Sequence, residues 1–330
     1  MKEILVKLYT GKVLTRDESV EALKELASGK YSEAEIASFL TVYLMREIAP
    51  EELLGFRDAM LEMCVQVDLS DYKLIDVCGT GGDEKNTFNI STISAFVLAG
   101  AGIKVAKHGN YAVSSPVGSS NVFEYFGYKF GNDPDKLKRE LDEANICYLH
   151  APFFHLAMKN VGLARKALKV KTFFNQLGPL SNPARPKYQY VGVFNKATLD
   201  LYSKLYQQTD INYSIVYSLD VYDEISLTSD FIINYKGNSS QISPKSIGFV
   251  NVEPGALFGG NTIVEAADIF TNILNGKGTK SQNDVVIANT AYALQCYMPD
   301  RSIADCIAIA KESLESKKAL GVFKKLIDIQ

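Results

Sequence analysis

Residues 76–92 read DVCGTGGDEKNTFNIST, and this stretch decides the fold. An apolar run that starts at Leu74 precedes its glycines, and a run of apolar and small residues from Ile93 to Gly102 follows it. This order predicts a short buried strand, a glycine-rich turn and a packed helix. Glycines let the backbone pass close to a ligand, and the free amides at the start of the helix favour an anion. We therefore expect a phosphate or sugar-phosphate site at the turn.

The polar side chains around this turn favour a binding site over a simple helix cap. More of them gather here than a cap uses. They are Asp83, Thr87, Asn89, Ser91 and Thr92. The glycine spacing fits neither common nucleotide motif, because GxxxxGK followed by Ser or Thr is absent, and so is GxGxxG. A glycine turn that only caps a helix is the alternative for this stretch alone.

Composition and charge are those of an ordinary globular chain. It has 330 residues, 47% of them apolar, and a formal net charge of -3, which gives no general attraction to nucleic acid or an anionic membrane. The widely spaced cysteines include no CxxC pair, so we expect free, buried thiols in a reducing compartment. No apolar stretch reaches the roughly 18 residues of a membrane span, and the N-terminus lacks the pattern of a signal peptide. We expect a cytoplasmic protein with no membrane or nucleic-acid partner.

The first 70 residues predict a small all-helical domain. Two capping boxes, Thr15 with Glu18 and Ser32 with Glu35, each precede an apolar periodic run, and Pro50 suits the first turn of a further helix. The apolar side chains outnumber what a three-helix unit can hide. Part of that face is expected to pack on other helices or on a second subunit, and burial entirely within the chain is the alternative.

From Lys73 onward, short apolar segments alternate with helical ones. This alternation predicts an α/β fold class, with a small N-terminal all-helical domain (1–70) and a larger α/β domain (71–330) that has a mostly parallel central sheet. Ligands of such folds bind beyond the carboxyl ends of the strands, where the glycine turn falls. The expected strands are Leu74–Cys78, Lys104–Ala106, Ile146–His150, Tyr188–Phe194 and Tyr213–Tyr217, and helices are expected to start near Ser91, Gly118, Pro134, Pro152, Lys196 and Asn261. Polar residues interrupt the apolar runs between Phe231 and Val250, which indicates an antiparallel excursion or an irregular loop.

Two further polar motifs follow later strands. Residues 107–120 read KHGNYAVSSPVGSS, with a cation in Lys107 and a helix start near Gly118, so this segment can surround a second phosphate group. Asp223 and Glu224 form an acidic pair after a predicted strand, and such oxygens bind Mg²⁺ together with substrate phosphate. Taken alone, a Ser- and Gly-rich loop is most often only a loop, and most acidic pairs are merely solvated.

Together these motifs resemble those of the anthranilate phosphoribosyltransferase family. The chain carries GTGGD at 79–83, NxST at 89–92, KHGN at 107–110, FNQLGPLSNP at 174–183 and DE at 223–224. The resemblance implies a fold shared with pyrimidine nucleoside phosphorylases and a role in tryptophan biosynthesis. It implies transfer of the phosphoribosyl group of 5-phosphoribosyl 1-diphosphate (PRPP) to anthranilate, giving N-(5-phosphoribosyl)anthranilate and diphosphate. It also implies a homodimer formed through the helical domain, to which part of residues 153–184 would return.

The same resemblance assigns site residues at the matching positions. It places Arg165 at the carboxylate of anthranilate, to which a guanidinium offers two parallel donors. Without the resemblance, Arg165 would be interpreted as part of a solvated helix face. The residues expected to bind PRPP are Gly79, Gly82, Asp83, Thr87, Asn89, Ile90, Ser91, Thr92, Lys107, His108, Gly109, Asn110, Ser114, Ser115 and Ser119. Those expected to bind anthranilate are Gly79, Asn110 and Arg165, and those expected to hold Mg²⁺, with two ions per subunit, are Ser91, Asp223 and Glu224.

The chain departs from the family pattern at three positions. Tyr111 replaces a residue that is commonly basic, and Leu156 and Leu163 replace residues that tend to be proline. No residue stands out as an obligatory general base, and the scattered histidines argue against a histidine-based metal centre. Two other functions compete: a pyrimidine nucleoside phosphorylase, which the intact motifs disfavour, and a non-catalytic nucleic-acid-binding relative, which the acidic charge disfavours.

Overall fold

The structure, a computed structural model, describes residues 1–112 and 116–330, and among these residues seven strands form one sheet. The strands lie in the order β3-β2-β1-β4-β5-β6-β7. β1 to β5 run parallel, β6 runs antiparallel to β5, and β7 runs antiparallel to β6. They are β1 (Leu74–Gly79), β2 (Lys104–Gly109), β3 (Ile146–His150), β4 (Tyr188–Gly192), β5 (Asn212–Ser218), β6 (Phe231–Tyr235) and β7 (Asn238–Ile242).

The order of the strands creates a crevice at the carboxyl ends of the central strands. From β1 the chain moves outward through β2 to β3, and it then returns to place β4 on the other side of β1. At such a switch point the loops that leave two neighbouring strands diverge, and ligands bind between them. β1 ends at Gly79 and β4 at Gly192, which are partners in the ladder. The glycine turn therefore begins at the switch point.

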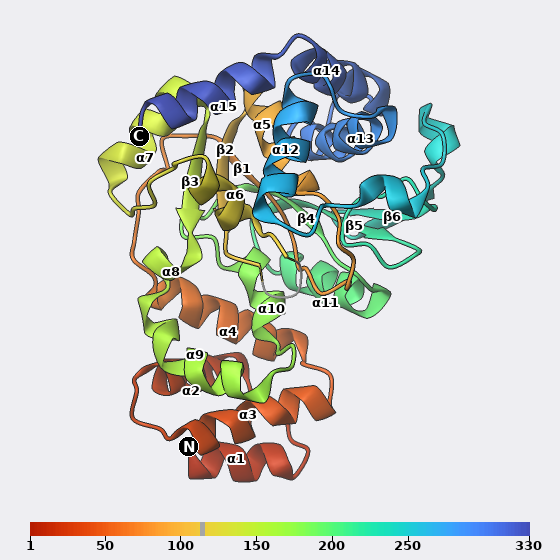
Figure 1. Ribbon diagram of the computed structural model, residues 1–330. Helices are drawn as coiled ribbons and strands as arrows, with labels where there is room; N and C mark the ends of the chain where they lie inside the picture. Colours follow the sequence, from red (N-terminus) through yellow and green to blue (C-terminus); the bar gives the residue numbers. More distant parts are fainter. Residues whose placement is uncertain (113–115) are drawn as a thin grey trace.

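Helices cover both faces of the sheet (Figure 1). On one face, Ile75 and Val77 of β1 share a hydrophobic core with α5 and the C-terminal helices. On the other face, Val191 of β4 and Ile215 of β5 pack with α11 and with the helical domain. The helices of the α/β domain are α5 (Ile90–Gly100), α6 (Ser119–Tyr125), α7 (Pro134–Ala144), α11 (Lys196–Tyr206), α12 (Ile263–Leu274), α13 (Lys280–Tyr297), α14 (Ile303–Glu315) and α15 (Lys318–Asp328).

The helical domain lies at the opposite end of the molecule from the C-terminus (Figure 1). A later helix, α9, belongs to the same group of helices, because it packs against α2 and α3. The ring of Phe173 stacks on that of Phe56 in α4 with centroids 4.8 Å apart, so the later segment shares the core of the N-terminal helices. The elements at this end are α1 (Lys2–Tyr9), α2 (Arg16–Ala27), α3 (Glu33–Met45), α4 (Pro50–Met63), α8 (Ala151–Phe154), η1 (Leu156–Met158), α9 (Lys159–Leu168), α10 (Phe174–Leu177) and η2 (Gly178–Leu180).

The predicted fold class and most predicted elements are confirmed. Both capping boxes form, and Pro50 opens α4. The expected strands match β1 to β5 with small differences at their ends, and the helix expected near Asn261 starts at Ile263. The excursion after Phe231 is the antiparallel hairpin β6–β7. Lys236 and Gly237 turn this hairpin with φ of 48° and 87°, as a tight type I′ turn requires.

The cysteines are buried or half-buried, as the sequence predicts. The apolar side chains of the helical domain are partly buried within the chain and partly exposed. All the cysteines are free, Cys78 is half-buried and the others are buried. In α3, Phe39 and Leu40 are buried within the chain, whereas Leu44 is 43% exposed and Met45 85% exposed. Across the described residues, no helix is both long and apolar enough to cross a membrane.

Candidate active site

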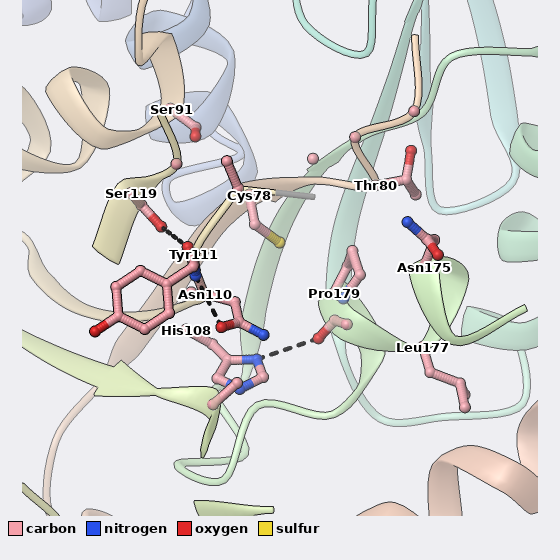
Figure 2. Close-up of a pocket in the computed structure, with 18 of the residues that line it drawn as sticks. Cys78, Thr80, Ser91, His108, Asn110, Tyr111, Ser119, Asn175, Leu177 and Pro179 are labelled. Atoms are coloured by element: carbon pink, nitrogen blue, oxygen red, sulfur yellow. Dashed lines mark hydrogen bonds between the residues drawn. The ribbon is translucent and has the colours of Figure 1, made fainter. Parts of the chain in front are cut away.

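A cavity of about 690 Å³ lies where the carboxyl ends of the central strands face the helical domain. The turns after β1 and β2 line one part of it, and the start of α9, α10 and η2 line another. In Figure 2, Ser91, Ser119 and His108 lie toward the left of the pocket, and Asn175 and Pro179 lie toward its right. Because strand ends and a separate helical segment form its walls, a ligand in the cavity can contact both.

The glycine turn after β1 is held against the loop that follows β5. The backbone amide of Gly81, whose φ is 63°, donates a hydrogen bond to Oδ2 of Asp223 at 2.7 Å. A Cβ at Gly79 would overlap that carboxylate oxygen and lie 3.0 Å from Cγ of Asp223. Glycine is therefore required at position 79 by close approach and at 81 by backbone conformation.

A cluster of carboxylates lies beside this turn. Burial and the neighbouring carboxylate of Asp83 raise the pKa of Asp223 to about 7. Burial and Asp223 likewise raise the pKa of Glu224 well above its usual range. Oε1 of Glu224 accepts the amide of Ser91 at 3.1 Å, but its Oε2 is buried with no hydrogen-bond partner among the described residues. Buried carboxylate oxygens that lack a partner are suited to a cation.

Lys107 supplies a buried cation between the strands. Its ammonium donates to the carbonyl oxygen of Val77 at 2.7 Å and lies 3.5 Å from Oγ of Ser91. Burial lowers the pKa of Lys107, and the carboxylate of Asp76 opposes this shift. The hydrogen bond to Val77 fixes the amine next to the glycine turn, where a phosphate bound beside it would favour its charged form.

The serine-rich segment after β2 is anchored by a chain of hydroxyl groups. Oγ of Ser119 lies 2.8 Å from the hydroxyl of Tyr148, which also lies 2.7 Å from Oγ of Ser120. Oγ of Ser120 in turn contacts Nδ1 of His150 at 2.8 Å. These contacts fix the start of α6, where Gly118 and Ser119 line the cavity and the amide of Gly118 donates to Oδ1 of Asn121 at 2.9 Å.

Two histidines, His108 at the end of β2 and His155 after α8, face each other in the cavity wall with ring centroids 5.3 Å apart. Nδ1 of His108 donates to the carbonyl oxygen of Gly178 at 3.2 Å, and Nε2 of His155 donates to that of Ser181 at 3.0 Å. Burial lowers the pKa of His108 to about 3 and that of His155 to about 4. Nε2 of His108 is left buried without a partner among the described residues, so it can accept a hydrogen bond from a ligand.

Arg165 reaches the cavity from α9 and differs from its basic neighbours. Its guanidinium lies 4.7 Å from the ring centroid of Phe174, and burial lowers its pKa. It forms no ion pair with any residue in 1–112 or 116–330. Lys166 and Lys169 are exposed, whereas Arg165 is half-buried. The solvated-face alternative thus describes these lysines and not Arg165.

The structure brings most of the expected site residues into this one cavity. Ile90, the first residue of α5, is an exception. Its side chain is buried in the core, and only its backbone could face a ligand. Ser114 and Ser115 lie outside the described residues. The expected residues that line the cavity are Gly79, Gly82, Asp83, Thr87, Asn89, Ser91, Thr92, Lys107, His108, Gly109, Asn110, Ser119, Arg165, Asp223 and Glu224.

Several other lining residues were not expected from the sequence. Lys85, His155, Phe174 and Asn175 all line the cavity. Two of them, Phe174 and Asn175, open the FNQLGPLSNP motif, so that motif could have assigned them. Tyr111, a departure from the family pattern, also lines the cavity and donates its hydroxyl to Glu124 at 3.1 Å.

Comparison with known proteins connects this geometry to a family. Residues 71–320 match the model of the glycosyl transferase family a/b domain, and residues 2–64 match that of its helical bundle domain. The chain is 51% identical over 329 residues to an anthranilate phosphoribosyltransferase of Bacteroides thetaiotaomicron, covering 100% of this chain and 99% of the relative.

Solved structures of that family are similar over nearly the full length. The anthranilate phosphoribosyltransferase from Thermus thermophilus aligns with a TM-score of 0.92 and 29% identity, over 98% of each chain. The one from Saccharomyces cerevisiae in complex with PRPP and Mg aligns with a TM-score of 0.90 and 26% identity, over 98% of this chain and 96% of the other.

Proposed function

We propose, since the chain belongs to the anthranilate phosphoribosyltransferase family of tryptophan biosynthesis, that the cavity at the end of the sheet is its active site. The single observation that carries this assignment is that four separate motifs meet in one cavity. The glycine turn, Lys107, the pair Asp223–Glu224 and Arg165 come from distant parts of the sequence and line the same cavity. In the reaction, the amine of anthranilate forms a bond to the anomeric carbon of PRPP, the bond to diphosphate breaks, and the amine loses one proton.

The phosphate groups of PRPP would be bound by the strand ends. The glycine turn and the start of α6 both line the cavity, and backbone at glycine turns and helix starts is suited to phosphate oxygens. Lys107 would add a fixed positive charge beside the leaving diphosphate, because its ammonium is buried and held by Val77. Preorganised donors of this kind stabilise the charge that develops on the leaving group.

The residues fit a magnesium site, and we assign it to Asp223 and Glu224 with Ser91 nearby. Within the described residues, no group of three His, Cys, Asp or Glu side chains could hold an ion alone. Mg²⁺ does not need one, because it keeps several waters and binds through one or two carboxylates plus substrate phosphates. The unpartnered Oε2 of Glu224 provides such an oxygen. When bound, the ion would neutralise charge on the diphosphate. We propose two ions per subunit.

Anthranilate would bind between the helical segment and the segment after β2. Arg165 can take its carboxylate, because the guanidinium is half-buried, forms no ion pair with a described residue, and rests on Phe174. Gly79 and Asn110 complete the proposed contacts. Nε2 of His108 can accept a hydrogen bond, but a pKa of about 3 prevents it from holding a proton at neutral pH. We therefore assign no general base.

Kinetics of Arg165→Ala test this assignment. The KM for anthranilate should rise while that for PRPP changes little, with a loss of roughly 1.5–3 kcal/mol for a charged hydrogen bond. Lys166→Ala, which removes an exposed charge from the same helix, is the control. A rise in the PRPP constant alone would assign Arg165 to the other substrate. A phosphorolysis assay with uridine and thymidine tests the nucleoside phosphorylase alternative and should show no activity.

We also propose that the molecule is a cytoplasmic homodimer, with the domains divided near Ser70. The apolar surface that supports a dimer lies on α1 and α3, where Tyr9 is 61% and Met45 85% exposed, and on α9, where Leu163 is 63% exposed. Light scattering should give twice the monomer mass, and Met45→Lys should reduce it. A monomeric wild type would contradict the dimer. Free cysteines favour the cytoplasm, which cell fractionation would test.

A further inference from the structure

A second cavity, of about 440 Å³, lies between the helical domain and the amino-terminal ends of β4 and β5. Arg16 of α2 and Arg57 of α4 line it from the helical domain, and Lys187 and Tyr206 line it from the α/β domain. It shares only Pro179 with the catalytic cavity. None of its polar groups has a part in the proposed reaction.

Cations outnumber their partners in this cavity. Arg16 donates through Nε to Asp58 at 2.6 Å, and Arg57 shares the same carboxylate through Nη1 at 3.3 Å. Arg185 is bound only by neutral groups, the carbonyl oxygen of Leu61 among them at 3.0 Å. The ammonium of Lys187 makes no hydrogen bond or ion pair within the described part of the chain. One carboxylate is thus divided between two guanidiniums, and two further cations lack an acidic partner.

The acidic groups at the margin do not cancel this excess. Glu62 pairs with Lys24 at 2.7 Å, and Asp210 is exposed like Arg185 and Lys187, so its single charge can offset only one of these two cations. Burial lowers the pKa of Arg57; Asp58 opposes this shift, and the nearby cations Arg16 and Arg185 add to it. The guanidiniums therefore lie close enough to repel one another, which an anion between them would relieve.

A buried hydroxyl at the cavity wall also lacks a partner. Tyr206 is 1% exposed, lines the cavity, and its hydroxyl forms no hydrogen bond with a described residue. Burying a hydroxyl without a partner costs free energy, and such groups in folded proteins usually have a partner. A ligand oxygen in the cavity would provide one. The apolar side chains of Leu61, Leu180 and Ile211 line the remaining wall.

We propose that this cavity is a second ligand site, which binds a small molecule through an oxyanion head group, either a phosphate monoester or a carboxylate. Arg57 and Tyr206 donate to the head group at the floor, and Arg185 and Lys187 contact it at the rim. Guanidinium groups suit this role because they present paired donors to planar or tetrahedral oxyanions. The walls of this cavity come from both domains. A bound ligand therefore holds the helical domain against the α/β domain next to the turn that carries Pro179.

Thermal unfolding of the full-length protein with added anion tests the proposal. Inorganic phosphate and benzoate serve as separate probes, and the probe whose stabilisation is reduced in the variants identifies the head group. The variants are Lys187→Gln and Tyr206→Phe. Neither side chain has a polar partner to lose, so both variants should fold with little change in Tm without anion. Lys324→Gln removes an exposed charge from α15, outside both cavities, and is the matched control.

Any binding of these probes at the catalytic cavity is common to all four proteins and cancels in the comparison. We expect one of the probes to raise Tm less in both variants than in the wild type, because each variant loses one donor, and to raise it equally in Lys324→Gln and the wild type. Equal rises in all four proteins, or no rise in the wild type with either probe, would overturn the proposal.

Discussion

Gly79→Ala should disable the enzyme while leaving its fold intact. The new methyl group would lie 3.0 Å from Cγ of Asp223 and overlap its Oδ2. Carbon atoms pack at about 3.5–4.0 Å, so the carboxylate would have to move by about 0.5–1 Å. The bond from the amide of Gly81, now 2.7 Å, would then exceed a normal hydrogen-bond length. A displacement of about 1 Å in a catalytic group can cost about 100-fold in rate.

Steady-state kinetics with PRPP, anthranilate and Mg²⁺ measure this effect. We expect kcat to fall by about 100-fold, equivalent to about 2.7 kcal/mol, with circular dichroism unchanged. Gly321→Ala is the matched control, because nothing lies within 4 Å of a Cβ there and Gly321 is in the interior of α15. It should preserve kcat and raise stability by roughly 0.5–1 kcal/mol. If Gly79→Ala retains wild-type kcat and the wild-type response to magnesium, the contact between the turn and Asp223 has no catalytic role.

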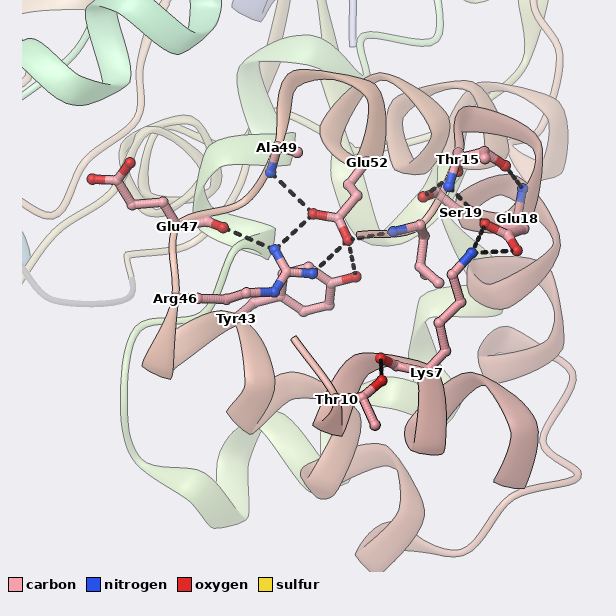
Figure 3. A network of polar contacts seen from close by, with 11 residues as sticks. Lys7, Thr10, Thr15, Glu18, Ser19, Tyr43, Arg46, Glu47, Ala49 and Glu52 are labelled. Carbon is pink, nitrogen blue, oxygen red and sulfur yellow. Dashed lines mark hydrogen bonds and ion pairs between the residues drawn. The ribbon is translucent and has the colours of Figure 1, made fainter. Parts of the chain in front are cut away.

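Stability should depend on three buried side chains, Glu52, His108 and His155. Glu52 accepts the amides of Leu14 and Ala49 at 3.1 and 3.0 Å and pairs with Arg46 at 2.6 Å (Figure 3). Glu52→Ala should thus lower the free energy of unfolding by about 3–5 kcal/mol, and a urea titration showing less than half of this loss would refute it. Burial lowers the pKa of His108 to about 3 and of His155 to about 4, so between those values and about 6.5 the unfolded chain binds more protons than the folded one. Each histidine should therefore lower the free energy of unfolding by about 1.4 kcal/mol between pH 7.5 and pH 5.5, while the raised pKa of Asp223 acts in the opposite direction in wild type and variant alike. His155→Asn should lose about 1.4 kcal/mol less than the wild type over this range, and equal changes in the two proteins would contradict the assignment for that residue.

Local patterns predicted the elements that local forces determine. The glycines after β1, the capping boxes at Thr15 and Ser32, and the alternation of strands with helices each depend on neighbours in sequence. The C-terminal helices α13, α14 and α15 were not among the predicted starts. In α13, buried residues occur on nearly every side, so its sequence lacks a clear amphipathic period.

The chemistry of the site depends on contacts that no local pattern contains. Asp223 follows Gly81 by 142 residues, yet its carboxylate binds that amide. The burial of Arg165 depends on how α9 packs against the N-terminal helices, which the sequence of α9 alone does not specify. The second cavity gathers Arg16, Arg57 and Lys187 in the same way. Resemblance to a family predicted a set of site residues, most of which line one cavity, because motifs record such long-range contacts indirectly.

We expect the carboxylates beyond β5 to serve the transfer reaction in the cavity at the carboxyl ends of the strands. Initial rates of N-(5-phosphoribosyl)anthranilate formation from PRPP and anthranilate, titrated with Mg²⁺, test it most directly. The wild type should form product only with Mg²⁺ present, and Asp223→Asn/Glu224→Gln should show a strongly reduced kcat and a weakened dependence on Mg²⁺. An active double variant with the wild-type magnesium response would contradict the account.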